Sequence, residues 1–226
     1  AVWVASVYNL DFPSQSGLSS EKLAAQLDEI VENTLGAGLN TIFFQVRPCA
    51  DALYKSDVFP SSEYLGNADF DALGYLVRKA HEKGIAVHAW VNPYRVTVSA
   101  SAHSDAEEKY SDLIMDVDGR LYFDPGKEGS VALIVRGVAE IVVKYDVDGI
   151  VFDDYFYPEG IDDEDSATYS GYVSAGGTDS LKDWRRENVN ELIRRTYAAV
   201  KQLRPDCLFG VSPRGIWRNS STDKNG

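Results

Sequence analysis

The residues best suited to chemistry are two adjacent carboxylates, Asp153 and Asp154, at the end of an apolar segment. The segment 149–152 is β-branched and aromatic, and the turn pair Asp148-Gly149 introduces it. Two tyrosines, a phenylalanine and a helix-excluding proline follow in residues 155–158. This pattern predicts a buried strand that delivers acids at its carboxyl end, which is where parallel α/β folds carry their chemistry. A role limited to ending the strand and capping the next segment would need one exposed aspartate and no aromatic row.

Polar side chains follow other apolar segments in the same way. Function distributed over the ends of many strands is typical of the (β/α)₈ barrel. Guanidinium and amide groups can hold sugar hydroxyls by hydrogen bonds, and aromatic faces can stack on sugar C–H surfaces. We therefore expect a carbohydrate polymer as partner, bound by Asn9, Asp11, Gln45, Arg47, His88, Trp90, Asn92, Tyr94, Arg95, Asp124, Tyr155, Tyr157 and Arg214.

Several of these residues have structural alternatives. His88, Trp90 and Asn92 share one face of a strand, so His88 lies deeper than Asn92, and a lone histidine in such a position is more often a core residue than a ligand or catalytic one. Asp124, which precedes Pro125, also fits a turn that leads into a helix. Arg47 and Arg95 can instead pair with Asp153 or Asp154 and keep a carboxylate ionised.

The elements that must position these residues alternate between strand and helix. Asp116 to Arg120 predicts a hairpin, because Asp-Gly between apolar flanks favours a tight turn, and residues 105–110 predict a short helix. The acidic, Ser/Gly-rich segment 159–180 is expected to be a loop. Strands are expected at 2–8, 41–47, 85–91, 149–153 and 208–213, and helices at 20–35, 71–83, 130–144 and 181–203.

This alternation predicts a parallel α/β sheet, either closed or open. No Gly-x-Gly-x-x-Gly follows the first strand and no Gly-Lys-Ser/Thr loop occurs, so nucleotide binding has no support. The polar strand ends favour a (β/α)₈ TIM barrel, of which this chain supplies about the first five strands. We expect one barrel domain over residues 1–226, truncated at its C-terminal end. Uncovered sheet edges would then favour self-association.

Composition narrows the partners further. The 226 residues are 44% hydrophobic with a formal charge of −13, which argues against nucleic acid. No apolar run approaches membrane-spanning length, so no membrane span is expected. Cys49 and Cys207 should lie at opposite ends of the sheet as unbridged thiols. His81, His88 and His103 show no metal-ligand spacing, and we expect neither a metal nor a cofactor.

The motifs together resemble the bacterial glycosyl hydrolase-like 10 family, over nearly the whole chain and in the family's order. They are Val2 to Pro13, Phe44-Gln45-Val46-Arg47-Pro48, Trp90 to Arg95, Asp124-Pro125-Gly126, Asp148 to Pro158 and Ser212 to Arg218. The resemblance implies a glycosidase barrel of the secreted fraction or cell envelope, with some members acting on peptidoglycan glycan strands. A signal peptide or lipoprotein anchor would then belong to the parent protein.

Glycoside hydrolysis needs two carboxyl groups that flank the scissile bond. The order Asp148-Gly149-x-x-x-Asp153 is similar to the fourth strand of the α-amylase superfamily, where the last Asp is the nucleophile, although that superfamily has Arg where Val151 stands. Asp153 is therefore the predicted nucleophile or base, and Asp154 the reserve or general acid. The second carboxylate could be Asp11, Asp124, Glu159 or an acid from the absent strands. The alternative is a catalytically weak barrel that binds glycans through its aromatic and amide residues, and a metal-dependent barrel hydrolase ranks third.

Overall fold

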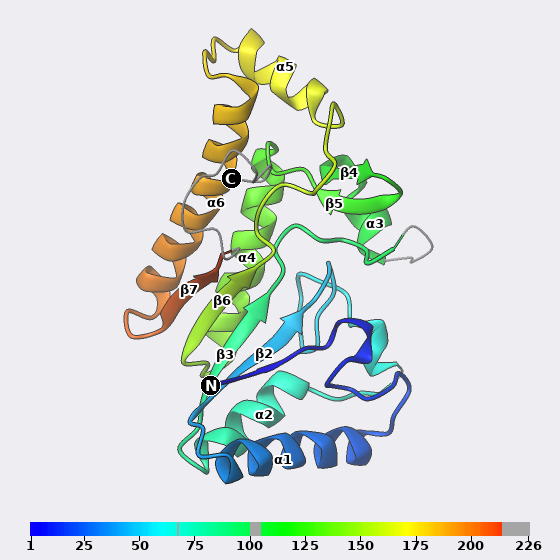
Figure 1. Ribbon diagram of the computed structural model, residues 1–226, viewed down its shortest axis with the longest axis vertical. Helices are drawn as coiled ribbons and strands as arrows, with labels where there is room; N and C mark the ends of the chain where they lie inside the picture. Colours follow the sequence, from blue (N-terminus) through cyan, green and yellow to red (C-terminus); the bar gives the residue numbers. More distant parts are fainter. Residues whose placement is uncertain (67, 100–104, 214–226) are drawn as a thin grey trace, which may run out of the picture.

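The fold is organised by a five-stranded parallel sheet in the order β1-β2-β3-β6-β7 (Figure 1). The computed structural model describes residues 1–66, 68–99 and 105–213. The strands of this sheet are β1 (Val2–Val4), β2 (Thr41–Arg47), β3 (Ala86–Val91), β6 (Gly149–Asp153) and β7 (Leu208–Ser212). Sequential strands lie side by side and run parallel, so their carboxyl ends meet along one edge, as predicted.

Three of the four helices that connect the sheet strands begin at a side-chain cap, and the helix that starts at Glu128 does not. Ser19 accepts the Lys22 N–H at the start of the first helix, and Asp71 accepts the Gly74 N–H at the start of the second. Further along the chain, Ser180 accepts the Asp183 N–H. The helices between the strands are α1 (Ser20–Gly36), α2 (Ala72–His81), α4 (Glu128–Lys144) and α6 (Leu181–Leu203).

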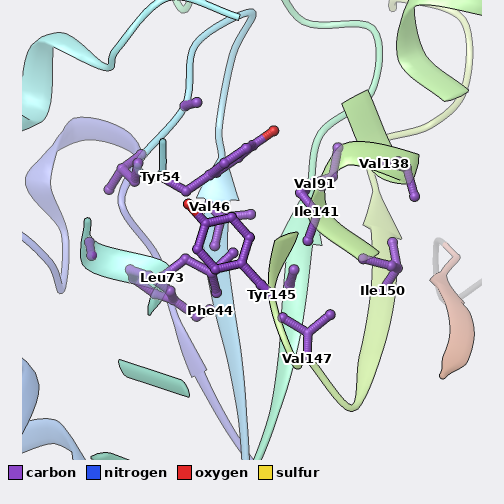
Figure 2. Close-up of a cluster of buried hydrophobic side chains, with 14 of the residues drawn as sticks. Phe44, Val46, Tyr54, Leu73, Val91, Val138, Ile141, Tyr145, Val147 and Ile150 are labelled. Atoms are coloured by element: carbon purple, nitrogen blue, oxygen red, sulfur yellow. The ribbon is translucent and has the colours of Figure 1, made fainter. Parts of the chain in front are cut away.

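The two faces of the sheet differ in their covering. One alternating set of side chains, such as Phe44, Val91 and Ile150, packs against Leu73, Ile141 and other helix residues in one continuous core (Figure 2). Because side chains alternate along a strand, the intervening residues face the other side. The helices therefore cover one face, as the outer ring of a barrel does.

The opposite face carries an aromatic row. Trp3 stacks on Phe43 at 4.4 Å between ring centroids and meets the edge of Trp90 at 5.0 Å. Phe43 in turn meets His88 at 5.0 Å. Trp3 remains 42% exposed and Leu208 56% exposed, so this inner face is open among the described residues.

β1 is shorter than the predicted strand 2–8. The side-chain oxygen of Gln45 accepts the backbone N–H groups of Ser6 and Val7, at 2.8 and 3.0 Å, and draws the chain away from the sheet. A 3₁₀ turn, η1 (Val7–Asn9), follows at once, with Tyr8 and Asn9 at positive φ. The Gln45 side chain of β2 thus takes the place of the backbone hydrogen bonds that would have extended β1.

The segment 159–180 is also more ordered than predicted. It contains the helix α5 (Ser166–Ser174), which projects beyond the sheet with the start of α6 (Figure 1). The helix buries no residue of its own, and its hydrophobic side is too weak to be seen as periodicity. Its anchors are an ion pair between Arg185 and the fully buried Asp165, and a ring contact of Tyr169 with Trp184.

The predicted hairpin is confirmed as β4 (Ile114–Val117) and β5 (Arg120–Phe123), joined at Asp118 and Gly119, which both have positive φ. It follows α3 (Asp105–Lys109) and η3 (Ser111–Leu113), while η2 (Glu63–Leu65) lies in the loop after β2. The hairpin hydrogen-bonds to the chain that leaves β3, because the Phe123 N–H donates to Tyr94 O and the Val96 N–H to Leu121 O.

The remaining sequence expectations concern the thiols and the membrane. Cys49 and Cys207 are both buried and unbridged, as predicted. In the ranges that the structure describes, no helix combines the length and apolarity needed to cross a bilayer.

Candidate active site

The site begins with a line of polar groups across the carboxyl ends of β1, β2, β3 and β6. Gln45 donates from Nε2 to Asn92 Oδ1 at 2.6 Å, while its oxygen holds the end of β1. Asn92 donates from Nδ2 to the backbone carbonyl of Asp153 at 3.2 Å. Both amides are almost completely buried and use their donors and acceptors on protein groups. They therefore fix the relative positions of the strand ends, which is a positioning role.

Asp153 is the last residue of β6 and shares the inner face with Val151. Its Oδ1 accepts the Asp154 N–H at 3.0 Å, and no described cation forms an ion pair with it. Burial raises the pKa of Asp153, and the charge of Asp154 adds to this effect, while the hydrogen bond from the Asp154 N–H and the charge of Arg95 partly oppose it. A partly buried carboxyl group with a raised pKa is a candidate general acid or base, and it can act as a nucleophile when ionised.

Asp154 leaves the strand direction at once. Its φ of 54° lies in the left-handed region, so its side chain does not simply point to the opposite face. The carboxylate forms an ion pair with Arg95, which also donates to Pro48 O at 3.5 Å. At this turn Asp154 lines the cavity described next, whereas Asp153 is not among its lining residues.

A cavity of about 370 Å³ opens beside this ion pair. It lies between the turn after β1, the hairpin and the segment after β6, at the strand-end edge of the sheet. Two carboxylates, two guanidinium groups and several aromatic rings line it. The lining residues are Val7, Tyr8, Leu10, Arg95, Thr97, Val98, Arg120, Tyr122, Asp154, Phe156, Tyr157, Pro158 and Glu159.

Sequence reasoning missed three prominent lining residues, Tyr8, Arg120 and Tyr122. Tyr8 is 63% exposed and is held by a bond from its N–H to Tyr64 Oη and from its own hydroxyl to Val98 O. The signal for Tyr8 was its position at the end of the predicted strand 2–8. No local signal places Arg120 and Tyr122, because the hairpin reaches the site only through its pairing with residues 94–97.

The structure does not bring Arg47 to this cavity. Its side chain is fully buried, its guanidinium lies 4.3 Å from the Phe59 ring centroid, and Nη2 donates to Pro93 O at 2.9 Å. Burial lowers the pKa of Arg47 to about 10. The site-facing arginine is Arg95, which pairs with Asp154.

Three polar residues of the predicted set form hydrogen bonds with nearby backbone groups. Asp11 accepts the Ala5 N–H at 2.8 Å, and Asn9 donates to Pro13 O at 2.9 Å, so both shape the loop after β1. Asp124 is buried and accepts the Gly126 N–H and the Thr168 hydroxyl. Asp124 therefore has the turn role that was its structural alternative.

Of the ring-bearing residues predicted to bind substrate, one lines the cavity and the others lie deeper in the protein. Tyr157 lines the cavity and its hydroxyl accepts from Asn188 at 2.8 Å; burial is the main cause of its raised pKa. Tyr155 packs against the core, and Tyr94 is buried. His88 and Trp90 lie deeper on the inner face, and burial lowers the pKa of His88. Arg214, also predicted to bind substrate, lies outside the described residues.

Among residues 1–66, 68–99 and 105–213, no group of three His, Cys, Asp or Glu side chains could hold a metal ion. The chemistry available in the described part is that of carboxylates, guanidinium groups and aromatic faces at the strand ends of a parallel α/β sheet. That combination of fold and site defines the class of glycosidase-type (β/α)₈ barrels, of which this chain forms a part.

Comparison with known proteins identifies the family. The chain belongs to the family described as Glycosyl hydrolase-like 10, whose profile matches residues 1–225. It is 35% identical over 239 residues to glycosyl hydrolase YngK of Bacillus subtilis, covering 100% of this chain and 47% of that protein. It is also 35% identical over 253 residues to glycosyl hydrolase DigH of Escherichia coli K12, covering 100% of this chain and 57% of that protein. The chain thus spans about half the length of these relatives.

Solved structures agree on the fold. An α-L-fucosidase isoenzyme 2 from Paenibacillus thiaminolyticus superposes with a TM-score of 0.60 at 19% identity, over 81% of this chain and 29% of that one. The glycoside hydrolase domain of PgaB from Bordetella bronchiseptica gives a TM-score of 0.57 at 15% identity, over 93% of this chain and 64% of that one. The predicted fold class, a (β/α)₈ barrel represented by its first five strands, is confirmed.

Proposed function

We propose that this chain carries part of the active site of a secreted or cell-envelope glycoside hydrolase that cleaves a bacterial cell-wall polysaccharide, with Asp153 as nucleophile or base. The observation that carries the proposal is the position of Asp153. Its carboxylate ends β6, the strand between β3 and β7, on the inner face, is half-buried with a raised pKa, and forms no ion pair with a described residue. A carboxylate with only a structural role normally has the partners that Asp153 lacks.

Asp154 and Arg95 support this centre. The guanidinium of Arg95 neutralises Asp154, and both line the cavity where a sugar ring would lie. Glu159 lines the same cavity and is our candidate for the second carboxylate within this chain. A retaining mechanism would require about 5–5.5 Å between the two carboxyl groups and an inverting one about 6.5–9.5 Å.

Peptidoglycan is the proposed substrate because the family resemblance points to its glycan strands. The test is turnover of purified glycan strands, with and without stem peptides, by the full-length gene product and its Asp153→Asn variant. Loss of cleavage in a folded Asp153→Asn protein supports the proposal. Unchanged cleavage would move catalysis to Asp154 or another acid.

The second candidate is a glycan-binding barrel without turnover. It is favoured by the cavity's exposed Tyr8 and the neighbouring Tyr122 and Tyr157, which supply binding surface but no acid. Tight glycan binding without cleavage by the unsubstituted protein would make this candidate the better account.

We also propose that residues 1–226 on their own self-associate. Trp3 and Leu208 are exposed on the inner face, and β1 and β7 each have only one neighbour in the described sheet. Light scattering after gel filtration should show oligomers. A monodisperse monomer with one cooperative melt above about 60 °C would contradict this expectation.

A further inference from the structure

Tyr8 combines a strained backbone with an exposed ring at the strand-end edge of the sheet. Its φ of 57° lies in the left-handed region. Asn9, Asp118 and Asp154 also have positive φ, but the short side chains of Asn and Asp tolerate this conformation. A bulky aromatic residue there is an outlier. Such strain persists only where the surrounding structure enforces it, and it is concentrated at functional sites.

Hydrogen bonds at and before Tyr8 enforce this conformation. Gln45 Oε1 accepts the N–H groups of Ser6 and Val7, which precede Tyr8 in the chain. The Tyr8 N–H itself donates to Tyr64 Oη at 3.1 Å. These bonds hold the backbone of Tyr8 away from the extended conformation that would continue β1.

The ring of Tyr8 is tethered at its tip and open to solvent. Its hydroxyl donates to Val98 O at 3.2 Å, yet the residue remains 63% exposed. The tether restricts the ring to fewer orientations, which lowers the entropic cost of binding a ligand against it. A strained backbone, a tethered hydroxyl and an exposed ring together form a preorganised stacking surface.

Tyr8 lies where two cavities meet. It lines the cavity of about 370 Å³ beside Asp154. A second cavity, of about 350 Å³, shares Thr97 and Val98 with the first and is lined by Tyr64 as well. Tyr8 is hydrogen-bonded to Val98 on the shared wall and to Tyr64 of the second cavity. Its ring is therefore anchored at the junction of the two cavities.

The second cavity offers hydrogen-bonding groups to a sugar. Hydroxyl and carboxyl groups line it, among them those of Ser61, Ser62, Glu63 and Asp105. Sugar hydroxyls both donate and accept hydrogen bonds, so these groups suit them. The segments that follow β1, β2, β3 and β6 form the two cavities, which therefore open on the same edge of the sheet. A glycan chain along this edge would cross Tyr8 between them.

We infer that Tyr8 is a specificity-determining residue, which stacks on a sugar ring at the junction and selects glycan chains long enough to reach both cavities. This inference rests on the proposed glycoside hydrolase function and adds a length requirement with the residue that sets it. The C–H face of a sugar packs on an aromatic face by apolar contact. Because this contact forms in the bound ground state as well as in the transition state, it acts on KM and not on kcat.

The experiment compares two variants of Tyr8 in the full-length protein. Tyr8→Asn removes the ring and tolerates the left-handed conformation, whereas Tyr8→Phe keeps the ring and removes only the hydroxyl bond to Val98 O. Tyr197→Asn is the matched control, because Tyr197 is 52% exposed on α6 and lines neither cavity. The probes are glycan strands without stem peptides, fractionated into disaccharides and longer strands. Calorimetry in an Asp153→Asn background gives affinity, and steady-state kinetics without that substitution give turnover.

Longer strands are expected to bind about 5–30-fold more tightly than the disaccharide, and Tyr8→Asn should remove this gain. Tyr8→Phe and Tyr197→Asn should retain most of it. Tyr8→Asn should also raise KM for longer strands while kcat stays within about twofold. Its Tm should be no lower than that of the unsubstituted protein, because the backbone strain is relieved.

The inference would be overturned by a length gain that survives Tyr8→Asn, by the absence of a length gain or by the absence of binding. A loss of the gain that comes with a lower Tm and a lower kcat would assign Tyr8 a structural role instead.

The two proposals fail separately. Cleavage by the unsubstituted protein, with KM unaffected by Tyr8→Asn, leaves the hydrolase and removes the role of Tyr8. Length-dependent binding that requires the Tyr8 ring, in a protein that cleaves nothing, leaves the stacking surface and removes the hydrolase.

Discussion

Strand β6 has an aspartate just before its start and another at its end, and the two carboxylates have opposite surroundings. Asp148 accepts the Val87 N–H at 2.7 Å and lies 3.0 Å from His81 Nε2. Among the described residues, the Asp153 carboxylate accepts only the N–H of its neighbour Asp154. The carboxylate of Asp148 thus has hydrogen-bond partners in the fold, whereas most of the hydrogen-bonding capacity of the Asp153 carboxylate remains available to a ligand.

The pKa directions follow from this difference. Burial acts on both groups and by itself raises each pKa. At Asp148 the hydrogen bonds from Val87 and His81 outweigh burial, so its pKa is lowered. At Asp153 burial prevails and the pKa is raised. The comparison shows that partner supply, and not burial alone, separates a structural carboxylate from a candidate catalytic one.

The largest expected effect is on turnover. Asp153→Asn should lower kcat/KM by roughly 10³-fold, because the nucleophile or base is lost while the shape is kept. Asp148→Asn should leave kcat/KM within about twofold, since Asp148 lies at the opposite end of the strand. Steady-state kinetics on glycan strands measure both. A comparable loss in the two variants would show that the strand ends are not functionally distinct.

A smaller effect is expected for the partner of Asp153. Asp154→Asn should lower kcat/KM by up to about 100-fold by misplacing the strand end. It should also move the acid limb of the pH profile to lower pH. The charge of Asp154 raises the pKa of Asp153, and Arg95, released from its ion pair, would lower it further. An acid limb that moves upward would exclude Asp153 as the group that must be ionised.

The effect of Asp148 should appear in stability. Its lowered folded-state pKa contributes stability above the unfolded-state pKa, and this contribution is lost as pH falls through the folded-state pKa. Because the Asp148 side chain is 41% exposed, solvent screens its contacts, and Asp148→Asn should cost about 1–2 kcal/mol near neutral pH and flatten the loss of stability in acid. Urea unfolding at a series of pH values measures this. A stability curve that keeps its full acid slope would assign the slope to other carboxylates.

The smallest effect concerns the ring that supports Asp148. His81→Gln removes one contact of the carboxylate and leaves the Val87 bond in place. We expect a loss of about 0.5–1.5 kcal/mol in the free energy of unfolding, with turnover unaffected. The matched variant His88→Gln changes another histidine near this strand, which packs on Phe43 and, among the described residues, senses the charge of Asp148 without a hydrogen bond or ion pair to it. Equal losses would indicate ring packing, and not the carboxylate contact, as the cause.

Much of the framework could be predicted from sequence because its signals are local. β2 and α6 have the predicted bounds, since an apolar run closed by Pro48 and a long periodic segment capped by Ser180 leave few alternatives. β1 was predicted too long because Gln45, distant in sequence, takes over its N–H groups. α5 was missed because it buries nothing.

The candidate site was less predictable. Arg47 and Arg95 both follow a strand, and only packing shows that one lies over Phe59 and the other pairs with Asp154. Arg120 and Tyr122 reach the cavity through a hairpin whose docking depends on residues 94–97. A local pattern can identify groups that end strands, but it cannot decide which of them become buried and which remain open.

The most direct test of this account is a ¹³C-detected pH titration of the aspartate carboxyl groups in the full-length protein, with Asp148→Asn and Asp153→Asn spectra for assignment. We predict that Asp153 titrates above the ordinary aspartate pKa of about 3.9 and Asp148 below it. Equal pKa values, or the reverse order, would contradict the claim that hydrogen-bond partners make Asp148 a structural carboxylate and leave Asp153 available for catalysis.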